Sequence, residues 1–473
     1  MLAGWARIAR KGATVMTGVD VLQELREHVR GAVITPADEG YDRARAVYNA
    51  MIDRHPRLIV RCANAGDVIA AVRYARERDL EVAVRGGGHS VPGFGTCDGV
   101  VIDLSGMRAV RVDPTNGTAR AEGGATWGDF NAATYAFGLA TTGGIISTTG
   151  VSGLTLGGGI GHLSRGCGLS CDNLVSADVV LADGRFVFAG EHENEDLLWA
   201  LRGGGGNFGA VTSLEFRLHP VEDVYGGLMF FELSAAGDLL RCYREFIADA
   251  PERLGLFPAF QIAPPLPFIP PERHGEPFLA FVGCWSGPVE EGERVLAPLR
   301  EVAPVVAEHM GPMPYPALNS AFDVLVPPGL QHYWKANFVV ELTDAAIEAH
   351  LRHGPKVPVV NSTMHIYPIN GACHRVAPDA TAFSHRDANF ATVIAGMWPD
   401  PADNPARIAW VRDYYAATAP HSKPGGYVNF MAGDDQERVR ANYGANYPRL
   451  AEIKRRYDPD NVFHLNQNIR PAA

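Results

Sequence analysis

The chain has 473 residues, of which 47% are hydrophobic and 20% are charged, and its formal net charge is -11. This composition is typical of a globular protein of two or three domains. The acidic balance argues against nucleic acid as a partner, because phosphate affinity needs a basic face. No segment approaches the roughly 18 consecutive apolar residues of a membrane span, so we expect no membrane partner either. Charges throughout the first 16 residues argue against a secretory signal, and a start at Met1 or at Met16 stays open.

The seven cysteines are odd in number and scattered along the chain. Such usage fits a reducing compartment better than a disulfide framework, so we expect a cytoplasmic protein. Cys167 and Cys171 form a C-x3-C pair, but no second pair completes a zinc site. The sequence therefore predicts no metal centre.

The first predicted elements form a strand–helix–strand unit over residues 57–85. The strand-like runs are RLIVR (57–61) and EVAVR (81–85), which we expect to be parallel. Between them lies a helix signal with Asn64 as its N-cap. A short buried strand follows in GVVIDLS (99–105). ADVVLADGRFVFA (177–189) predicts a hairpin with Asp183-Gly184 as its two-residue turn.

The composition of the chain changes after about Pro220. Residues 261–285 alternate prolines with apolar strand-like runs, and AAGDLLRCYREFIADA (235–250) predicts a helix. This pattern indicates a second α+β domain over residues 221–420. From Gly425 onward the sequence predicts a strand, a long helix and an asparagine-rich tail.

Glycines cluster in four places: VRGGGHSVPGFG (84–95), EGGATWGD (122–129), the run from Gly150 to Asn173, and LRGGGGNFGAVT (201–212). No Walker A string occurs, and Pro92 prevents the helix that a Rossmann fingerprint needs. Backbone N–H groups of such loops can still hold a pyrophosphate, and several loops together indicate a long cofactor. Tight turns in a glycine-rich sheet protein are the alternative.

In order, VRGGGHS, GGATWGD, GLTLGGGIGHLSRGCGLSCDN, LLWALRGGGGNFG and YDPDNVFHLNQNI resemble the vanillyl-alcohol-oxidase-type flavoproteins, and more narrowly the berberine-bridge-enzyme-like FAD-linked oxidases. The resemblance covers residues 59–471. It implies an α+β fold with a two-part PCMH-type FAD-binding domain and an α+β substrate domain containing an antiparallel sheet. The implied division is an N-terminal extension with the first helices (1–54), the FAD-binding domain (55–220), the substrate domain (221–420) and a segment completing the FAD domain (421–473).

The resemblance also implies that His89 bonds covalently to the 8α-methyl group of FAD. A hydrogen-bonded loop histidine is the alternative. Many members carry a second link from a cysteine whose position falls on Ile146, and isoleucine cannot form a thioether. Cys167 and Cys171 lie beyond that position and are expected to be packing thiols, so we expect a single bond through His89.

The remaining cofactor-binding residues that the resemblance implies lie in the same motifs. They are Arg85, Gly86, Gly87, Gly88, Ser90, Gly93, Asp103, Leu104, Gly124, Thr142, Gly143, Ser147, Thr148, Thr149, Gly150, Gly153, Leu154, Gly157, Gly158, Gly159, Gly161, Asp172, Asn173, Val179, Asn429, Asn466 and Asn468.

Oxidation of an alcohol needs a base for the hydroxyl proton while flavin N5 takes the hydride. In relatives this base is often a tyrosine in a Y-x-N context, which Tyr427 matches, and Tyr367 matches its partner. Two aromatic residues lining a core are the alternative. Thr392 and Ile394 fall where some relatives keep an acid–base residue, which disfavours ring closure on an amine substrate. His365, His374 and His385 are spare candidates.

The resemblance thus implies an FAD-dependent oxidase that oxidises an alcohol-bearing small molecule, a saccharide or a secondary metabolite, and passes electrons to molecular oxygen. In this family a small residue three positions after the second-link cysteine admits oxygen, and that position is Thr149. The alternatives are a dehydrogenase or metabolite-tailoring oxidase of the same family, and a flavin- or ligand-binding protein without turnover. A monomer and a homo-oligomer both remain open.

Overall fold

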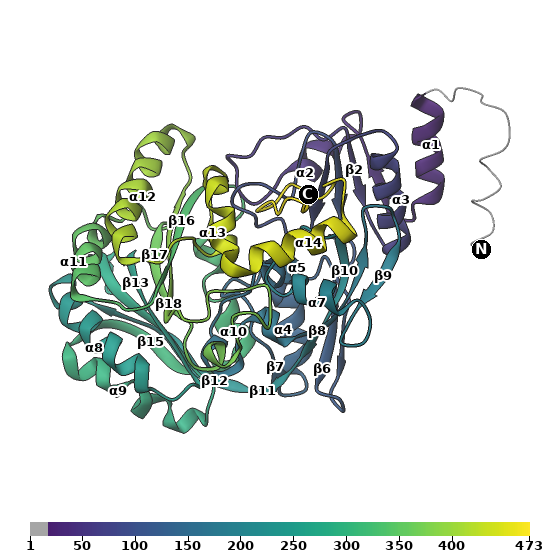
Figure 1. Ribbon diagram of the computed structural model, residues 1–473. Coiled ribbons are helices and arrows are strands. Elements are labelled where there is room, and N and C mark those ends of the chain that lie inside the picture. The colour runs from purple at the N-terminus through teal and green to yellow at the C-terminus, as the bar shows by residue number, and fades with distance from the viewer. Residues whose placement is uncertain (1–17) are drawn as a thin grey trace.

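The computed structural model describes residues 18–473, so the charged start and the choice between Met1 and Met16 lie outside the described residues. Two smaller sheets lie at one end of the molecule and a seven-stranded sheet lies at the other (Figure 1). This arrangement confirms the α+β class with an antiparallel sheet in the second part. The domain boundaries given above stay a prediction.

The first sheet has four strands in the order β1-β2-β4-β3. Strands β2 and β3 both run parallel to β4, which lies between them, so the predicted strands are parallel without being neighbours. The connecting helix is capped by Asn64, whose side chain accepts from the N–H of Asp67 at 3.2 Å. The elements are α1 (Gly18–His28), β1 (Ala32–Ile34), α2 (Tyr41–Arg45), β2 (Leu58–Arg61), α3 (Ala65–Arg76), β3 (Val82–Arg85) and β4 (Val100–Asp103).

The second sheet is antiparallel, in the order β5-β6-β10-β8-β9. Its strands are β5 (Val110–Asp113), β6 (Thr118–Glu122), β8 (Leu174–Val180), β9 (Phe186–Ala189) and β10 (Ala210–Arg217). The hairpin of β8 and β9 is confirmed, but the two-residue turn is wrong. Leu181 N–H donates to the carbonyl of Arg185, and Gly184 has φ +76°. The loop therefore contains three residues with glycine in the left-handed position.

Short helices and a two-stranded ribbon carry the glycine-rich loops between these strands. They are α4 (Trp127–Tyr135), α5 (Val151–Leu156), α6 (Ser164–Cys167), α7 (Glu195–Leu201), β7 (Leu139–Ala140) and β11 (His219–Pro220). Trp127, Phe130 and Phe216 make edge-to-face contacts in the core behind the loops, with ring centroids 5.3–6.0 Å apart. This packing fixes the loops on a rigid base.

The third sheet is antiparallel throughout, in the order β15-β12-β14-β13-β17-β18-β16. Its strands are β12 (Asp223–Phe231), β13 (Leu254–Ile262), β14 (Pro277–Trp285), β15 (Val305–Pro314), β16 (Gln331–Val339), β17 (Thr363–Pro368) and β18 (Phe390–Trp398). Helices α8 (Ala236–Asp249), α9 (Gly292–Val302), α11 (Asp344–His353) and α12 (Asn404–Thr418) pack on one face, and α10 (Tyr315–Ser320) lies at the edge. The predicted helix over residues 235–250 is confirmed by α8.

Alternation along the strands divides the sheet into two faces. On β17, Met364 and Ile366 join the core under the helices. Thr363, His365 and Tyr367 point the other way, toward the glycine-rich loops. The sheet therefore supplies a wall to the functional site.

The C-terminal segment departs from prediction in two respects. No strand forms around Tyr427, which instead precedes a one-turn 3-10 helix at Val428–Phe430. The expected long helix is broken into α13 (Val439–Tyr443) and α14 (Tyr447–Tyr457), because Gly444 takes φ +51° and Pro448 starts the next helix.

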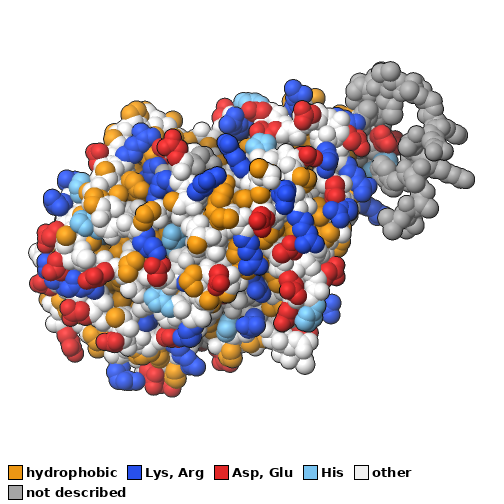
Figure 2. Space-filling model, viewed as in Figure 1, with side chains coloured by type: hydrophobic (Ala, Val, Ile, Leu, Met, Phe, Trp, Pro, Cys, Tyr) orange, Lys and Arg blue, Asp and Glu red, His pale blue; other side chains and the backbone are white. Residues whose placement is uncertain are grey.

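Charged side chains of both signs lie on the surface. On the face shown in Figure 2, acidic and basic side chains are interspersed over both halves of the molecule. Among the described residues, no helix is both long and apolar enough to cross a lipid bilayer.

Candidate active site

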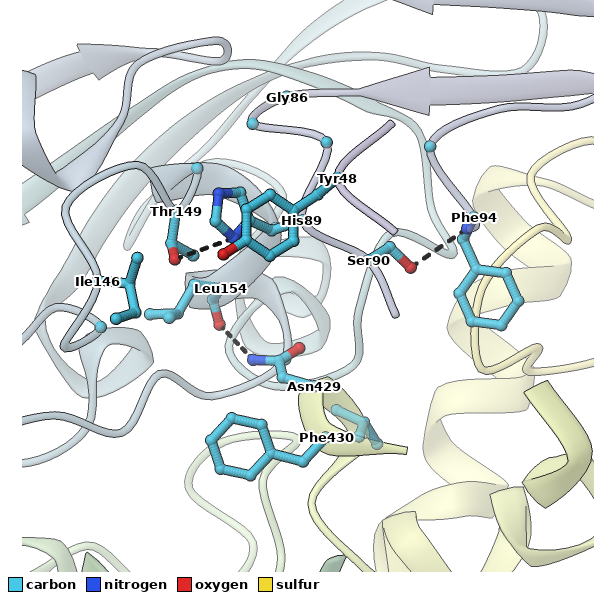
Figure 3. Close-up of a pocket in the computed structure, with 18 of the residues that line it drawn as sticks. Tyr48, Gly86, His89, Ser90, Phe94, Ile146, Thr149, Leu154, Asn429 and Phe430 are labelled. Atoms are coloured by element: carbon cyan, nitrogen blue, oxygen red, sulfur yellow. Dashed lines mark hydrogen bonds between the residues drawn. The ribbon is translucent and has the colours of Figure 1, made fainter. Parts of the chain in front are cut away.

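A cavity of about 370 Å³ is lined on one side by the glycine-rich loops and on the other by the seven-stranded sheet. Figure 3 shows His89, Ile146 and Thr149 on the loop side, with Asn429 and Phe430 opposite. The C-terminal segment closes the cavity between these two walls. The candidate site is therefore assembled from three separate parts of the chain.

His89 is half-buried in this cavity and its ring is held from three directions. Tyr48 stacks on it at 3.8 Å between centroids, with an interplanar angle of 19°. Thr148 Oγ1 lies 3.0 Å from Nε2, and Thr149 Oγ1 lies 3.4 Å from Nδ1. Burial lowers the pKa of His89 to about 4, so the imidazole is neutral at physiological pH.

The glycines before His89 are required by geometry. Gly88 has φ +72°, a conformation that disfavours a side chain. A Cβ on Gly87 would lie 2.4 Å from the backbone N of Gly150. The two loops thus meet backbone to backbone, and this contact brings Thr148 and Thr149 to the histidine ring.

The cavity fits a long cofactor laid along the loops. A Cβ on Gly153 or Gly206 would meet no atom within 4 Å, and both glycines line the cavity, so a side chain at either would enter the open space. The buried Oδ1 of Asn466, another lining residue, has no hydrogen-bond partner within the described chain. An unpartnered buried acceptor is expected where a ligand supplies the donor.

Arg85 is the one lining residue in the described chain with a full charge. Its guanidinium donates to Asp103 at 2.9 Å and to the carbonyl of Ala44 at 2.7 Å. Burial raises the pKa of Asp103, but Arg85 outweighs it and the net pKa is lowered. Asp103 also pairs with Arg61 at 3.3 Å, and the contact between Arg85 and Asp103 ties β3 to β4 beneath the glycine loop.

The structure brings about half of the predicted cofactor residues to the cavity. Those that line it are Arg85, Gly86, Gly87, Gly88, His89, Ser90, Leu104, Thr149, Gly150, Gly153, Leu154, Gly157, Asn429 and Asn466.

The other predicted residues lie outside the lining, and several hold its loops in place. Asp172 pairs with Arg386 at 2.6 Å, and Thr142 donates to the carbonyl of Gly168 at 2.7 Å. The residues outside the lining are Gly93, Asp103, Gly124, Thr142, Gly143, Ser147, Thr148, Gly158, Gly159, Gly161, Asp172, Asn173, Val179 and Asn468.

Ile146, at the position of the second link, lines the cavity. Cys167 and Cys171 do not line it, nor does any other described cysteine. Cys171 is fully buried in the core, where burial raises its thiol pKa. This placement agrees with the expectation that both are packing thiols.

Tyr427 is buried and is one of the residues that line the cavity. The oxygen accepts the N–H of Gly159 at 2.7 Å and the side-chain amide of Asn429 at 2.8 Å. Burial raises the pKa of Tyr427, and these two hydrogen bonds oppose that rise only in part. Asn429 also donates to the carbonyl of Leu154, which ties the C-terminal segment to α5.

Tyr367 lies across the cavity on β17 and pairs with His365 on the same face. Its hydroxyl lies 2.6 Å from Nδ1 of His365. Burial lowers the pKa of His365 to about 3 and raises that of Tyr367. The histidine is therefore neutral, and the tyrosine donates to it.

The other candidate residues from the sequence do not line the cavity. His374 contacts the carbonyl of Ala388, and His385 that of Asn442, each at 2.9 Å. Thr392 and Ile394 do not line the cavity, whereas their strand neighbours Val393, Ala395 and Met397 do. These three apolar side chains are equally unsuited to acid–base chemistry.

Sequence reasoning missed much of the lining. Tyr48 precedes the glycine motifs and no local pattern marks it. Most of the substrate-side wall was missed as well, because it comes from alternate residues of strands without a motif: Phe257, Gln261, Val282, Trp334, Thr363 and Val393.

Comparison with known families supports this assignment of the loops. Residues 56–190 match a family described as an FAD binding domain, and residues 426–470 match one described as berberine and berberine like. An FAD-linked oxidoreductase of Dictyostelium discoideum is 32% identical, over 95% of this chain and 97% of that protein. The (R)-6-hydroxynicotine oxidase of Paenarthrobacter nicotinovorans is 30% identical, over 94% of this chain and 98% of that protein.

Solved structures of oxidases are also similar to this chain. The crystal structure of 6-hydroxy-D-nicotine oxidase from Arthrobacter nicotinovorans superposes with a TM-score of 0.83 at 28% identity, covering 94% of this chain and 98% of that one. A chitooligosaccharide oxidase, at 22% identity, shares the fold with a TM-score of 0.82 over 96% of this chain and 99% of that one. The chain belongs to the berberine-bridge-enzyme-like FAD-linked oxidases and is an FAD-linked oxidoreductase.

Proposed function

We propose that this enzyme oxidises an alcohol-bearing small molecule, holds FAD through one covalent bond to His89, and passes electrons to molecular oxygen to give hydrogen peroxide. The observation that carries the proposal is the cavity itself. Its lining includes His89 from the glycine-rich loops, whose imidazole is neutral, and two tyrosines, Tyr367 and Tyr427, which supports this proposal. FAD, when bound, supplies the acceptor for the hydride that leaves the alcohol carbon.

His89 is suited to the covalent bond because its nitrogens are distinguishable. If Nε2 carries the proton and donates to Thr148, Nδ1 keeps a free lone pair, since its contact with Thr149 is long. Stacking on Tyr48 fixes the plane of the ring. With Ile146 in place of a cysteine, no second bond is proposed.

Tyr427 is the proposed base for the hydroxyl proton. Two donors converge on its oxygen and favour the anionic form. The protein atoms alone leave its pKa above the ordinary value, so this role requires bound FAD to lower it. Tyr367 is the proposed partner, because neutral His365 gives its hydroxyl proton an acceptor. This arrangement favours turnover over a protein that only carries flavin.

Thr149 is the proposed entry point for oxygen, because its small side chain lines the cavity beside His89. Reduced enzyme is expected to reoxidise quickly in air-saturated buffer with stoichiometric release of peroxide. Thr149→Leu should slow that reaction, because the larger side chain fills the approach, whereas anaerobic reduction by substrate should change little. Stopped-flow absorbance measures both steps.

Thr149→Ser, which keeps the hydroxyl and stays small, is the matched control and should behave like the wild type. Wild-type enzyme that stays bleached for minutes in air would make the protein a dehydrogenase with another electron acceptor. Equal reoxidation of the wild type and Thr149→Leu would remove the gating role from this residue.

A further inference from the structure

The substrate-side wall of the cavity has an unusual charge pattern. The lining contains no aspartate, glutamate or lysine within the described chain. Its single arginine, Arg85, lies on the cofactor side and pairs with Asp103, which also pairs with Arg61. The histidine of this wall, His365, has its pKa lowered to about 3 by burial, so it is neutral as well. A charged ligand group would therefore have no counter-charge here.

The polar groups of this wall form a narrow strip. They lie on and just before β17 (Asn361, Thr363, His365, Tyr367), and Gln261 stands beside them because it pairs with Thr363 in the sheet. Apolar side chains flank the strip on both sides: Phe257 and Val282 on one, and Trp334, Val393, Ala395 and Met397 on the other. A polyhydroxylated ring would bury several hydroxyl groups against these flanks without partners.

The reactive end of the strip is aromatic. Phe257 lies 4.6 Å from Tyr367, and Phe430 lies 4.7 Å from Tyr427, between ring centroids. Trp334 is level with Thr363 in the sheet, but its ring reaches to 5.9 Å from that of Phe430, and its buried indole N–H has no partner within the described chain. These aromatic side chains favour a flat ring in this part of the cavity, and the indole N–H favours an acceptor oxygen on that ring.

The far end of the strip offers acceptors. Gln261 and Asn361 each use an amide N–H on a backbone carbonyl, that of Val360 and that of Leu325 respectively. Their side-chain carbonyl oxygens accept no hydrogen bond from the described residues and can therefore accept one from a ligand. Thr363 marks this end and is four residues from Tyr367, about 13 Å along an extended strand.

We infer that the substrate is an uncharged, elongated, mainly apolar aromatic alcohol rather than a saccharide or an amine. Its oxidisable carbinol lies beside Tyr427 and Tyr367, and a neutral hydrogen-bond donor at the other end meets Gln261 and Asn361. The position of the carbinol rests on the proposed alcohol oxidation. The absence of charge, the aromatic character and the distal donor rest on the cavity lining alone.

The test uses the FAD-loaded enzyme and two readouts. Calorimetry measures binding of a neutral aryl ketone bearing a distal hydroxyl, of its carboxylate and ammonium counterparts, and of cellobiose. The neutral ketone should bind at least ~100-fold more tightly than either charged counterpart, and cellobiose should not compete. Anaerobic bleaching of the flavin absorbance then compares the corresponding aryl alcohol with cellobiose.

Gln261→Glu is the matched variant, because it is nearly isosteric and half-buried. It should weaken the carboxylate ligand further and improve binding of the ammonium ligand by about 10-fold or more. Gln261→Leu should weaken only ligands with the distal donor, by about 2- to 10-fold.

The inference is overturned if cellobiose binds or bleaches the enzyme better than the aryl compounds, or if the charged ligands bind the wild type as well as the neutral one. The proposed function fails separately if the aryl ketone binds as described but no alcohol reduces the enzyme.

Discussion

At the residue scale, Tyr427 and Tyr367 differ in what their hydroxyl groups do. Tyr427 accepts two hydrogen bonds, whereas Tyr367 donates one to His365. The two donors on Tyr427 oppose the rise in its pKa that burial causes, whereas Tyr367 keeps its proton in a hydrogen bond to neutral His365. The two side chains are therefore distinguishable by substitution.

Tyr427→Phe removes one oxygen from a buried ring and should leave the fold and the flavin spectrum intact. Reduction by substrate should slow by roughly 10²- to 10⁴-fold, the usual contribution of a positioned base. Rapid-mixing absorbance under anaerobic conditions measures this step. An unchanged rate would show that Tyr427 is not the base. Tyr367 would then be the next candidate, and His365→Phe would test it by removing its hydrogen-bond acceptor.

Residue identities in the loops were predictable from sequence for a physical reason. Gly87 is required by a close backbone approach and Gly88 by a positive φ, so glycine at these positions can be recognised in the sequence alone. Tyr48 was not predictable, because its contact with His89 depends on tertiary packing alone.

At the scale of elements, helix α14 anchors the C-terminal tail through one buried ion pair. Lys454 donates to Asp458 at 2.5 Å and to the carbonyls of Asn207 and Phe463. Asp458 in turn accepts the N–H of Phe463 at 2.8 Å. These bonds hold the tail that carries Asn466 against the last glycine loop.

Lys454→Met should lower the free energy of unfolding by ~3–5 kcal/mol, because it leaves a buried carboxylate without its counter-charge and two carbonyls without the ammonium donor. Urea denaturation of the purified holoenzyme measures the loss. Arg456→Met on the same helix is the control, since its pair with Asp196 is largely exposed and contributes under ~1 kcal/mol. Equal effects of the two substitutions would contradict the anchoring role.

Elements with strong local signals were predicted well. The N-cap of α3 and the apolar pattern of α8 suffice to place those helices. The strand expected around Tyr427 does not form, and the segment is instead tied to α5 by the side chain of Asn429, which donates to the carbonyl of Leu154. Tertiary contacts of this kind leave no periodic trace in the sequence.

At the scale of the whole molecule, histidines in the interior make stability depend on pH. Burial lowers the pKa of His162 to about 4, and those of His332, His350 and His365 to about 3. In the unfolded chain each titrates near 6.5, so the unfolded state takes up protons first as pH falls. The contribution of these histidines to the free energy of unfolding is therefore complete above about pH 6.5 and decreases as the pH falls toward 4.

Each histidine contributes up to ~1.4 kcal/mol per pH unit in this window, so the urea midpoint should fall clearly between pH 7 and pH 5. His162→Phe should reduce the slope without loss at pH 7, because neither ring nitrogen has a hydrogen-bond partner in the described chain. A midpoint that is constant or rises as the solution is acidified would contradict this expectation.

The overall division into a glycine-rich cofactor part and a sheet-based second part was predictable from the ordered motifs. The chemistry of the substrate wall was not, because it depends on which alternate residues of β13, β16, β17 and β18 face the cavity. That choice is set by the packing of the helices on the opposite face.

The proposed function depends most directly on one covalent bond between His89 and FAD. Wild-type enzyme is denatured in acid, digested with trypsin and analysed by mass spectrometry. The flavin mass is expected on the peptide of residues 86–108, and His89→Ala should release free FAD on denaturation. Free FAD from the wild type, or flavin on the peptide of residues 166–185 that contains Cys167 and Cys171, would contradict the single bond through His89.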